Sequence, residues 1–212
     1  MSYLLKQKNK MFVFIHIPKT GGTTIQKICE NTENIKFKKI NYADDGHLYN
    51  GHLPARPLAR RYSILHHNYF SIVRNPWDWY VSWFSYLDQK NRSDKDFQAE
   101  IKLIEEGFPS FLEFISNNRN NLVFENGCKK YAQFVDWCSI GDKIIDNVFR
   151  LEDLKENPFL IRDKIGLDIA FNKQYNTSNH ALYPKYYDKK TIDIVYNMHK
   201  EDIKTFNFEF GK

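Results

Sequence analysis

The sequence predicts an α/β fold in which a central parallel sheet is flanked by helices, giving three layers. Apolar, β-prone runs over residues 11–17, 69–73 and 147–150 are each followed by a helical pattern, and this alternation is typical of a parallel sheet covered on both faces. The chain has 212 residues, with no internal repeat and no low-complexity linker. We therefore expect a single domain over residues 1–212, with a core large enough to be stable alone.

Local patterns predict the remaining elements. Residues 36–41 form a weaker strand candidate. Glu152 and Asp153 are expected to begin a helix after the strand that ends at Arg150, because carboxylates favour the positive end of the helix dipole. Residues 44–65 are polar and loop-rich, and such segments commonly contact substrates. Further helices are predicted over residues 23–30, 77–88, 97–106, 110–116, 129–138, 158–165 and 191–207, the last with a break near His199.

The stretch from Phe12 to Thr24 has the pattern of a strand, a tight loop and the start of a helix. The apolar run stops at Pro18, and a cation, two glycines and two hydroxyl residues follow. A helix N-terminus presents unpaired backbone N–H groups and a positive dipole end, which favour anions, and glycine allows close approach of the backbone. The pattern predicts a phosphate or sulfate site formed by Lys19, Thr20, Gly21, Gly22, Thr23 and Thr24.

Two other interpretations explain this loop less well. A Walker A loop places its lysine after the glycines, whereas Lys19 precedes them and no glycine lies between Met1 and Gly21. The hydroxyl residues could also serve only as a helix cap. The cation, the paired glycines and the preceding strand together favour anion binding over both alternatives.

A second strand, turn and helix are predicted over residues 69–84. Asn75-Pro76 forms the turn, and proline suits the first turn of a helix. Arg74 thus lies at the carboxyl end of the strand, and Ser82 follows two helical turns later. Arginine can bind phosphate through two parallel hydrogen bonds, and ligands of open α/β sheets bind at the carboxyl ends of strands. Both anion-binding motifs are therefore expected at that edge of the sheet.

Together the two motifs resemble those of sulfotransferases that use 3′-phosphoadenosine 5′-phosphosulfate (PAPS), most closely the carbohydrate O-sulfotransferase branch. Pro18–Thr24 is similar to the 5′-phosphosulfate loop of that family, and Arg74 with Ser82 is similar to its 3′-phosphate motif. The resemblance implies a P-loop-like fold and PAPS as the donor co-substrate. It also implies sulfuryl transfer to an acceptor hydroxyl, with a saccharide as the expected acceptor and adenosine 3′,5′-bisphosphate (PAP) as the released product.

The resemblance extends beyond the two motifs. Residues 148–154, 179–187 and 202–210 are similar to later segments of the same branch. Asn75 stands where the branch often has aspartate, and the tryptophans between residues 77 and 83 stand where basic or aliphatic residues are common. Neither difference removes a predicted phosphate ligand, but both are expected to alter the surface near the nucleotide.

The proposed reaction needs a cation and a base. By analogy with phosphoryl transfer, the enzyme must align the reactants and stabilise charge on the leaving oxygen, and Lys19 is the candidate for the second task. Histidine is the usual general base near neutral pH. The first choice is His52, since the base of related carbohydrate enzymes resembles a Gly-His between the two motifs. The alternatives are His47, in a second Gly-His-Leu sequence, and the carboxylates Asp44 and Asp45.

Other candidates have less specific signals. His16 lies inside the first predicted strand and is expected to pack in the core. His66 and His67 are expected to lie at the surface or to contact residues that hold the ligand. Lys185 lies in an aromatic and basic segment that could close over the nucleotide, as late loops do in related enzymes, or could be an ordinary surface loop. The three arginines between residues 56 and 61 could form a basic wall for an acidic acceptor or a solvated helix face.

The composition limits the partners and the compartment. A net charge of +5 suits an anionic nucleotide or saccharide, and nucleic-acid binders usually concentrate more charge.

No apolar run approaches the roughly 18 residues of a membrane span, and residues 1–10 are too polar for a signal peptide. Three cysteines without a Cys-x-x-Cys pair favour a reducing compartment. We therefore expect a cytoplasmic enzyme without a metal site, since no cluster has ligand spacing; the oligomeric state is not predicted.

Two other functions compete with sulfuryl transfer. A nucleotide kinase-like phosphotransferase using ATP and Mg²⁺ would need a lysine after the glycines, which the loop lacks. A non-catalytic module that binds PAPS or PAP would keep both phosphate motifs but show no turnover. Within the sulfotransferase interpretation, a glycan, a lipid, a peptide tyrosine and a small alcohol are all open as acceptors.

Overall fold

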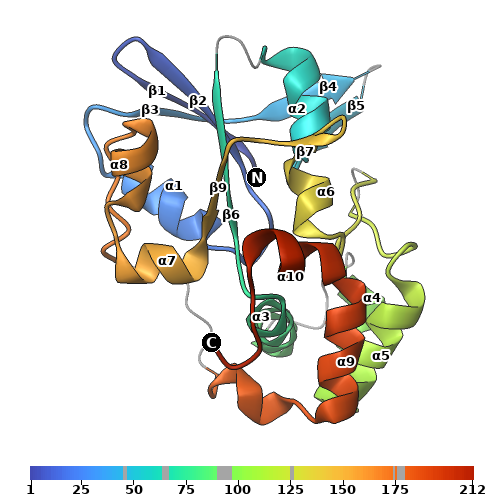
Figure 1. Cartoon of the computed structure of the whole chain (residues 1–212). Helices are drawn as coiled ribbons and strands as arrows, with labels where there is room; N and C mark the ends of the chain where they lie inside the picture. The colour runs from blue at the N-terminus through green and yellow to red at the C-terminus, as the bar shows by residue number, and fades with distance from the viewer. Residues whose placement is uncertain (45–46, 64–66, 90–96, 125–126, 174, 176–179) are drawn as a thin grey trace. The chain divides into compact units, whose positions relative to one another are not determined.

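A computed structural model describes the chain except for residues 45–46, 64–66, 90–96, 125–126, 174 and 176–179 (Figure 1). The side chains of residues 41–50 also lie outside this description. The chain divides into two compact units, which are described separately. The first unit comprises Met1–Arg74 and Phe134–Thr177, and the second comprises Asn75–Gln133 and Ser178–Lys212. The expected single domain over residues 1–212 stays a prediction.

The first unit contains a five-stranded mixed sheet in the order β3-β1-β2-β6-β9. Strands β2, β6 and β9 are parallel, whereas β1 is antiparallel to both of its neighbours. The expectation of a wholly parallel sheet is therefore wrong on the β1 side. The bounds are Tyr3–Gln7 for β1, Lys10–Ile15 for β2, Lys36–Lys39 for β3, Asn68–Val73 for β6 and Asn147–Arg150 for β9.

The strand β1 was not predicted from the sequence. Lysines at positions 6, 8 and 10 make the N-terminal segment look polar, yet Tyr3 and Leu5 are buried at alternate positions, as expected for a strand with one covered face. A tight turn joins β1 to β2, and Lys8 has a φ of 52° there. Because two residues suffice to reverse the chain in a hairpin, the strand before the predicted one pairs with it antiparallel.

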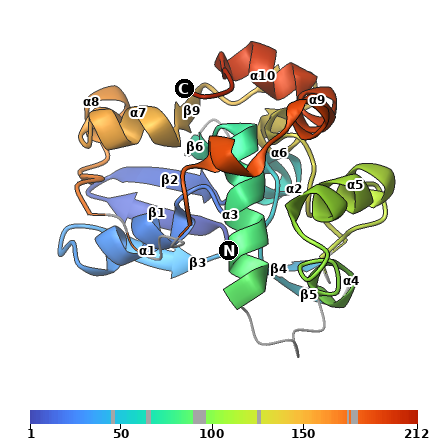
Figure 2. The same cartoon turned by 90° about the horizontal axis from the view of Figure 1, so that it is seen from below.

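One face of the sheet packs against helices α1 (Gly22–Glu30), α7 (Leu151–Glu156) and α8 (Leu160–Ile165). Figure 2 shows α1 near β3, and α7 and α8 near β9. Phe12 and Phe14 of β2 are fully buried and share this hydrophobic core with Ile25 of α1. The predicted helix start at Glu152 and Asp153 is confirmed, because both lie in the first turn of α7.

The other side of the sheet carries α2 (Ala55–Arg61) and α6 (Phe134–Cys138), as Figure 1 shows. The segment predicted as loop-rich, residues 44–65, thus contains regular structure, including a hairpin of β4 (Asn41–Asp44) and β5 (His47–Asn50). A second short hairpin pairs β7 (Ser139–Ile140) with β8 (Lys143–Ile144). The helix predicted over residues 129–138 begins only at Phe134.

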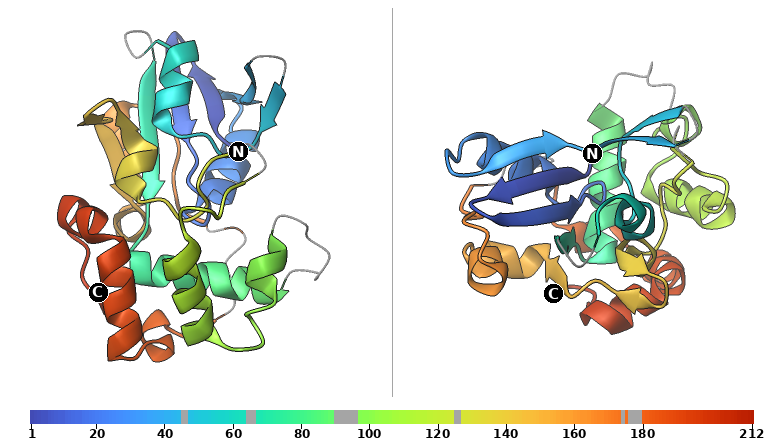
Figure 3. Two further views of the ribbon diagram at one scale, coloured as in Figure 1. Left: turned by 90° about the vertical axis from the view of Figure 1, so that its right-hand side faces the viewer. Right: turned by 90° about the horizontal axis from the view of Figure 1, so that it is seen from above.

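The second unit is helical in its described part. It contains α3 (Pro76–Gln89), α4 (Gln98–Ile101), α5 (Phe108–Asn118), the 3-10 helix η2 (Tyr183–Tyr186), α9 (Lys189–Met198) and α10 (Lys200–Phe206). Figure 3 shows α5 in green beside α9 in red, and Lys190 of α9 pairs with Glu113 of α5 at 2.5 Å. The predicted break at His199 is confirmed, since α9 ends and α10 begins on either side of it.

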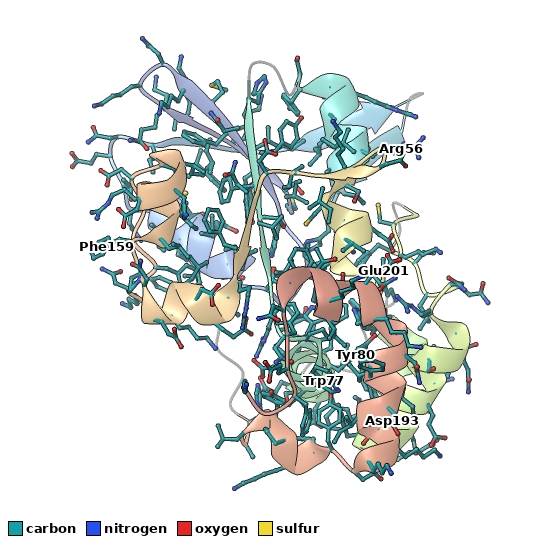
Figure 4. All side chains as sticks on the ribbon, viewed as in Figure 1. Arg56, Trp77, Tyr80, Phe159, Asp193 and Glu201 are labelled. Atoms are coloured by element: carbon teal, nitrogen blue, oxygen red, sulfur yellow. The ribbon has the colours of Figure 1, made fainter. Side chains whose placement is uncertain are left out.

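Aromatic side chains fill the second unit. The tryptophans of α3, which the sequence analysis expected to alter a surface, are at most 3% exposed, and Figure 4 shows Trp77 and Tyr80 among packed side chains. Tyr80 lies 3.1 Å from Nε2 of His199, whose Nδ1 donates to Asp202 at 2.6 Å. Over the described residues, no helix has both the length and the apolarity to cross a membrane.

Candidate active site

The loop between β2 and α1 adopts a backbone suited to anions. Lys19 has a φ of 64° and Gly21 a φ of 96°, so two residues of this loop are left-handed. Alternation of left-handed with other conformations turns successive N–H groups toward one point and forms an anion-binding concavity. Helix α1 begins at Gly22, so its unpaired N–H groups and positive dipole end add to the same field.

The left-handed conformation of Lys19 is unusual because it carries a side chain, and such a conformation costs about 1–2 kcal/mol. Two hydrogen bonds hold the surrounding loop. The hydroxyl of Thr20, which is fully buried, donates to the carbonyl of Ile17 at 2.8 Å. Nη1 of Arg74, at the end of β6, donates to the carbonyl of Lys19 at 3.1 Å. The structure thus brings Arg74 of the second motif to the loop of the first.

The predicted threonines have different environments. The hydroxyl of Thr24 is almost buried and accepts a hydrogen bond from the backbone N–H of Tyr175 at 3.1 Å. Thr20 is also buried, whereas Thr23 is partly exposed. The side chains of Thr20 and Thr24 therefore tie the loop to neighbouring backbone, and Thr23 has the most accessible of the three hydroxyls.

Both glycines of the loop are required by their surroundings. A Cβ on Gly21 would lie 3.2 Å from side-chain atoms of Leu151 and Phe171, at a φ that disfavours side chains. A Cβ on Gly22 would lie 1.8 Å from Nε2 of His16. The imidazole of His16 is therefore packed directly against the first residue of α1.

The structure places His16 beside the proposed base. The two rings of His16 and His52 lie 4.5 Å apart between centroids, in an edge-to-face arrangement. Nδ1 of His52 lies 2.8 Å from the carbonyl of His16, and because a carbonyl only accepts, Nδ1 carries the proton. A neutral His52 therefore has its lone pair on Nε2, which is the form that a general base requires.

The proximity of His16 was missed in the sequence analysis, which assigned this residue to the core. It is indeed buried, at 8% exposed, but it lies at the loop rather than within β2, which ends at Ile15. A signal existed, since His16 is the one polar residue in the run from Phe12 to Ile17. Its contact with His52, 36 positions later, could not be predicted from that run.

Ser2 is a second residue that the sequence analysis missed. Its Oγ accepts from the N–H groups of His16 and Leu53 at 3.2 and 3.4 Å and lies 3.2 Å from the carbonyl of Leu53, to which it donates. Its backbone N–H donates to the carbonyl of Gly51 at 3.2 Å. The segment around His52 is thereby tied to the end of β2. No local pattern marks a serine at the second position for this task.

Electrostatics keep both imidazoles neutral. Burial lowers the pKa of His52 to about 3, and the amino group of Met1, when it is protonated, acts in the same direction, while the bond to His16 opposes them. Burial is also the main cause that holds the pKa of His16 well below its ordinary value, followed by the charge of His52 when protonated. At neutral pH both rings are therefore uncharged.

The other predicted residues are distributed over the chain. Ser82 is buried in α3 and Lys185 is exposed in η2. Both belong to the second unit, so their shares in a 3′-phosphate site stay predictions. His47 lies in β5 with its side chain outside the description, and Asp45 lies outside the described residues.

The arginines of α2 and the side chain of Asn75 were also candidates for a place near the site. The arginines of α2 are exposed, and Figure 4 shows Arg56 directed outward from that helix. Asn75 holds the turn before α3, since its amide donates to the carbonyl of Glu209 at 2.8 Å and its Oδ1 accepts from the N–H of Trp77 at 3.1 Å. Within the described part of the chain, no group of three or more His, Cys, Asp or Glu residues could hold a metal ion.

Comparison with known proteins identifies the family. The model of the sulfotransferase family matches residues 2–209. The matched range includes the loop, Arg74 and the two histidines. No curated protein matches the chain.

Proposed function

We propose that this chain, which belongs to the sulfotransferase family, transfers a sulfuryl group from PAPS to a hydroxyl group of a saccharide and releases PAP. The main support is the loop with two left-handed residues before α1, joined to Arg74 through the carbonyl of Lys19. Members of this family generally use PAPS. The proposal includes a P-loop-like, three-layer arrangement and membership of the carbohydrate O-sulfotransferase branch, whereas a cytoplasmic location stays a prediction.

The donor would bind through both motifs. The N–H groups at the start of α1 and the hydroxyl of Thr23 would hold the 5′-phosphosulfate. By the resemblance of the sequence motifs, Arg74 and Ser82 would be ligands of the 3′-phosphate, and Lys185 would be a further nucleotide ligand. A guanidinium carries five donors, so the bond from Arg74 to Lys19 is compatible with phosphate binding.

The transfer would be an in-line displacement at the sulfur of the donor. Nε2 of His52 would take the proton of the acceptor hydroxyl while the acceptor oxygen forms its bond to sulfur. The bond between sulfur and the bridging oxygen would break, and its electron pair would remain on the 5′-phosphate of PAP. The ammonium of Lys19 would stabilise that charge, which is the largest contribution expected of such a site. His47 is the alternative base.

The testing experiment is a calorimetric titration with PAP, run beside 5′-AMP and ATP with Mg²⁺. Micromolar binding of PAP, with clear preference over 5′-AMP, is expected because only PAP carries a 3′-phosphate. Arg74→Ala should weaken PAP binding roughly 10- to 100-fold, since hydrogen bonds to charged groups contribute about 1.5–3 kcal/mol. Arg162→Ala is a matched control, because Arg162 is exposed on α8 and stacks on Phe159.

Three results would contradict the proposal. Preference for ATP with Mg²⁺ would favour a kinase-like phosphotransferase. Unchanged affinity in Arg74→Ala would remove that residue from the phosphate site. PAP binding without sulfate transfer from labelled PAPS to any of a panel of saccharides, lipids, tyrosine peptides and small alcohols would indicate a non-catalytic binding module. Transfer to an acceptor other than a saccharide would change only the substrate class.

A further inference from the structure

The imidazole of His16 fills the space over Gly22. An ideal Cβ on Gly22 would meet Nε2, Cδ2 and Cε1 of that ring at 1.8, 2.0 and 2.3 Å. Real Cβ atoms do not approach other atoms this closely, so the ring and the glycine are matched in shape. Any movement of this ring is therefore felt at the start of α1, where the phosphate-binding loop ends.

The same residue limits the motion of His52. Its carbonyl accepts from Nδ1 of His52 at 2.8 Å, and its ring meets the ring of His52 at an angle of 60°. The hydrogen bond selects the tautomer with the lone pair on Nε2. The edge-to-face contact restricts rotation of the His52 ring about its Cβ–Cγ bond, and such aromatic contacts contribute to ring placement beyond the area they bury.

The backbone of this arrangement is fixed independently of the ring. Ser2 bonds to the N–H of His16 and to both backbone groups of Leu53. The segment that carries His52 is therefore held in place even when the side chain at position 16 is changed. This separation makes it possible to remove the ring of His16 and keep the rest of the arrangement.

His16 is poorly placed to act as the base itself. Its Nε2 is covered by Gly22, and its Nδ1 lies 3.0 Å from the carbonyl of Met1. Both ring nitrogens thus face the chain. The ring can fix the positions of the groups packed against it, but neither of its nitrogens is placed to accept the proton of an acceptor hydroxyl.

We propose that His16 is a positioning residue that couples the phosphate-binding loop to His52. The ring holds Nε2 of His52 at a fixed place relative to Gly22, so the anion held by the loop and the acceptor proton are aligned by one side chain. This inference rests on the proposed function, in which the loop binds the donor and His52 is the base.

The first test separates turnover from binding in variants of position 16. His16→Ala should lower kcat roughly 10- to 100-fold, since small displacements of a catalytic group have effects of this size, while the Kd for PAP changes less than about threefold. His16→Phe keeps a flat ring without nitrogens and should retain most of the turnover. His67→Ala, which changes a partly exposed histidine of the same unit, should match the wild type.

The second test is a rescue at Gly22. Gly22→Ala alone should weaken PAP binding, because its methyl group displaces the ring and with it the start of α1. In His16→Ala the space is vacant, so adding Gly22→Ala should leave PAP affinity within about threefold of the wild type. Turnover should stay low in the double variant, because the ring that positions His52 is still missing.

The third test does not depend on activity. The NMR signals of the His52 ring in the ligand-free protein should show a protonated Nδ1 in the wild type, His16→Phe and His16→Ala, because the backbone carbonyl that accepts this proton is retained in all three. The chemical shifts should give one sharp set of ring signals in the wild type and in His16→Phe, and exchange-broadened ring signals in His16→Ala, where the edge-to-face contact is lost. If the wild type fails to bind PAP, the proposed function fails, and these shifts still report on the ring contact.

Several outcomes would overturn the inference. Equal turnover in His16→Ala and the wild type would show that the ring does not position the base. A loss in His16→Phe as large as in His16→Ala would assign the effect to a ring nitrogen. Failure of the rescue would show that the ring of His16 is not coupled to Gly22, and equally sharp His52 ring signals in His16→Ala and the wild type would show that it does not restrain His52.

Discussion

The two units contain buried histidines with contrasting partners. In the first unit, His16 contacts backbone groups and another imidazole, and burial holds its pKa well below the ordinary value. In the second unit, His199 is fully buried between a carboxylate, Asp202, and a phenol, Tyr80. The contacts of His16 hold a neutral ring beside the loop before α1. The contacts of His199 join it to Asp202 and Tyr80 between the helices of the second unit.

This difference shows where the chain uses polar groups for stability and where it keeps them for a site. Buried polar groups that satisfy one another, as in the second unit, stabilise a single arrangement of helices. The buried polar groups of the first unit instead tie backbone segments around the loop, through Ser2, Thr20 and Thr24. Substitutions should therefore affect unfolding in the second unit and ligand chemistry in the first.

The largest effect on stability is expected for Asp202→Ala. It would leave the Nδ1–H of His199 buried without its acceptor, and removal of one member of a buried pair costs about 3–5 kcal/mol in the free energy of unfolding. Urea unfolding followed by circular dichroism would measure it. Asp193→Ala, an exposed position on α9, is the control and should change little. Equal stability of the two variants would remove the contrast between the units.

Lys19→Ala should have the largest effect on turnover. Loss of the ammonium would leave the charge of the leaving oxygen unstabilised, and kcat should fall about 10²- to 10³-fold while PAP still binds. Lys27→Ala, on the exposed face of α1 where Lys27 pairs with Glu30, should keep the wild-type rate in the same transfer assay. A rate unaffected by Lys19→Ala would exclude this lysine from the mechanism.

Gly21→Ala and Gly141→Ala compare a crowded and an open glycine within the first unit. Both have positive φ, at 96° and 63°, but only Gly21 has side-chain atoms within 4 Å of a new Cβ. Gly141→Ala should lower the free energy of unfolding by about 1 kcal/mol through backbone strain alone. Gly21→Ala should lower it by roughly 1–3 kcal/mol, because the new methyl group also crowds neighbouring side chains. Thermal unfolding would measure both. A smaller loss for Gly21→Ala would contradict the packing against Leu151 and Phe171.

The dependence of stability on pH tests the burial of His52. The pKa of His52 is about 3 in the fold and ordinarily 6.5, so the unfolded chain binds a proton as the pH falls below 6.5 and the folded chain does not. This contribution to stability is therefore present above pH 6.5 and is lost toward pH 3. His52→Asn should flatten the decline of Tm between pH 8 and 5, with His180→Asn as the control. An identical slope in the wild type and His52→Asn would contradict the lowered pKa.

The sequence alone determined the features that depend on neighbouring residues. The apolar runs of β2, β6 and β9, the loop after β2, the turn at Asn75 and the break at His199 were all predicted close to their observed bounds. Each depends on local periodicity, on glycine and proline, or on the resemblance of short motifs. The backbone form of the loop belongs to this class, because it arises from a strand, a few turn residues and a helix start, and anion binding there stays a prediction.

Only the tertiary structure decided how distant residues meet. The tie formed by Ser2, the bond from Arg74 to Lys19 and the contact of His16 with His52 join positions 14 to 55 residues apart. Such contacts depend on the order of strands in the sheet and on side-chain directions at their ends, which no local pattern encodes. A buried histidine next to a strand looks the same in sequence whether it fills a core or positions a base, because the difference lies in the group packed against it.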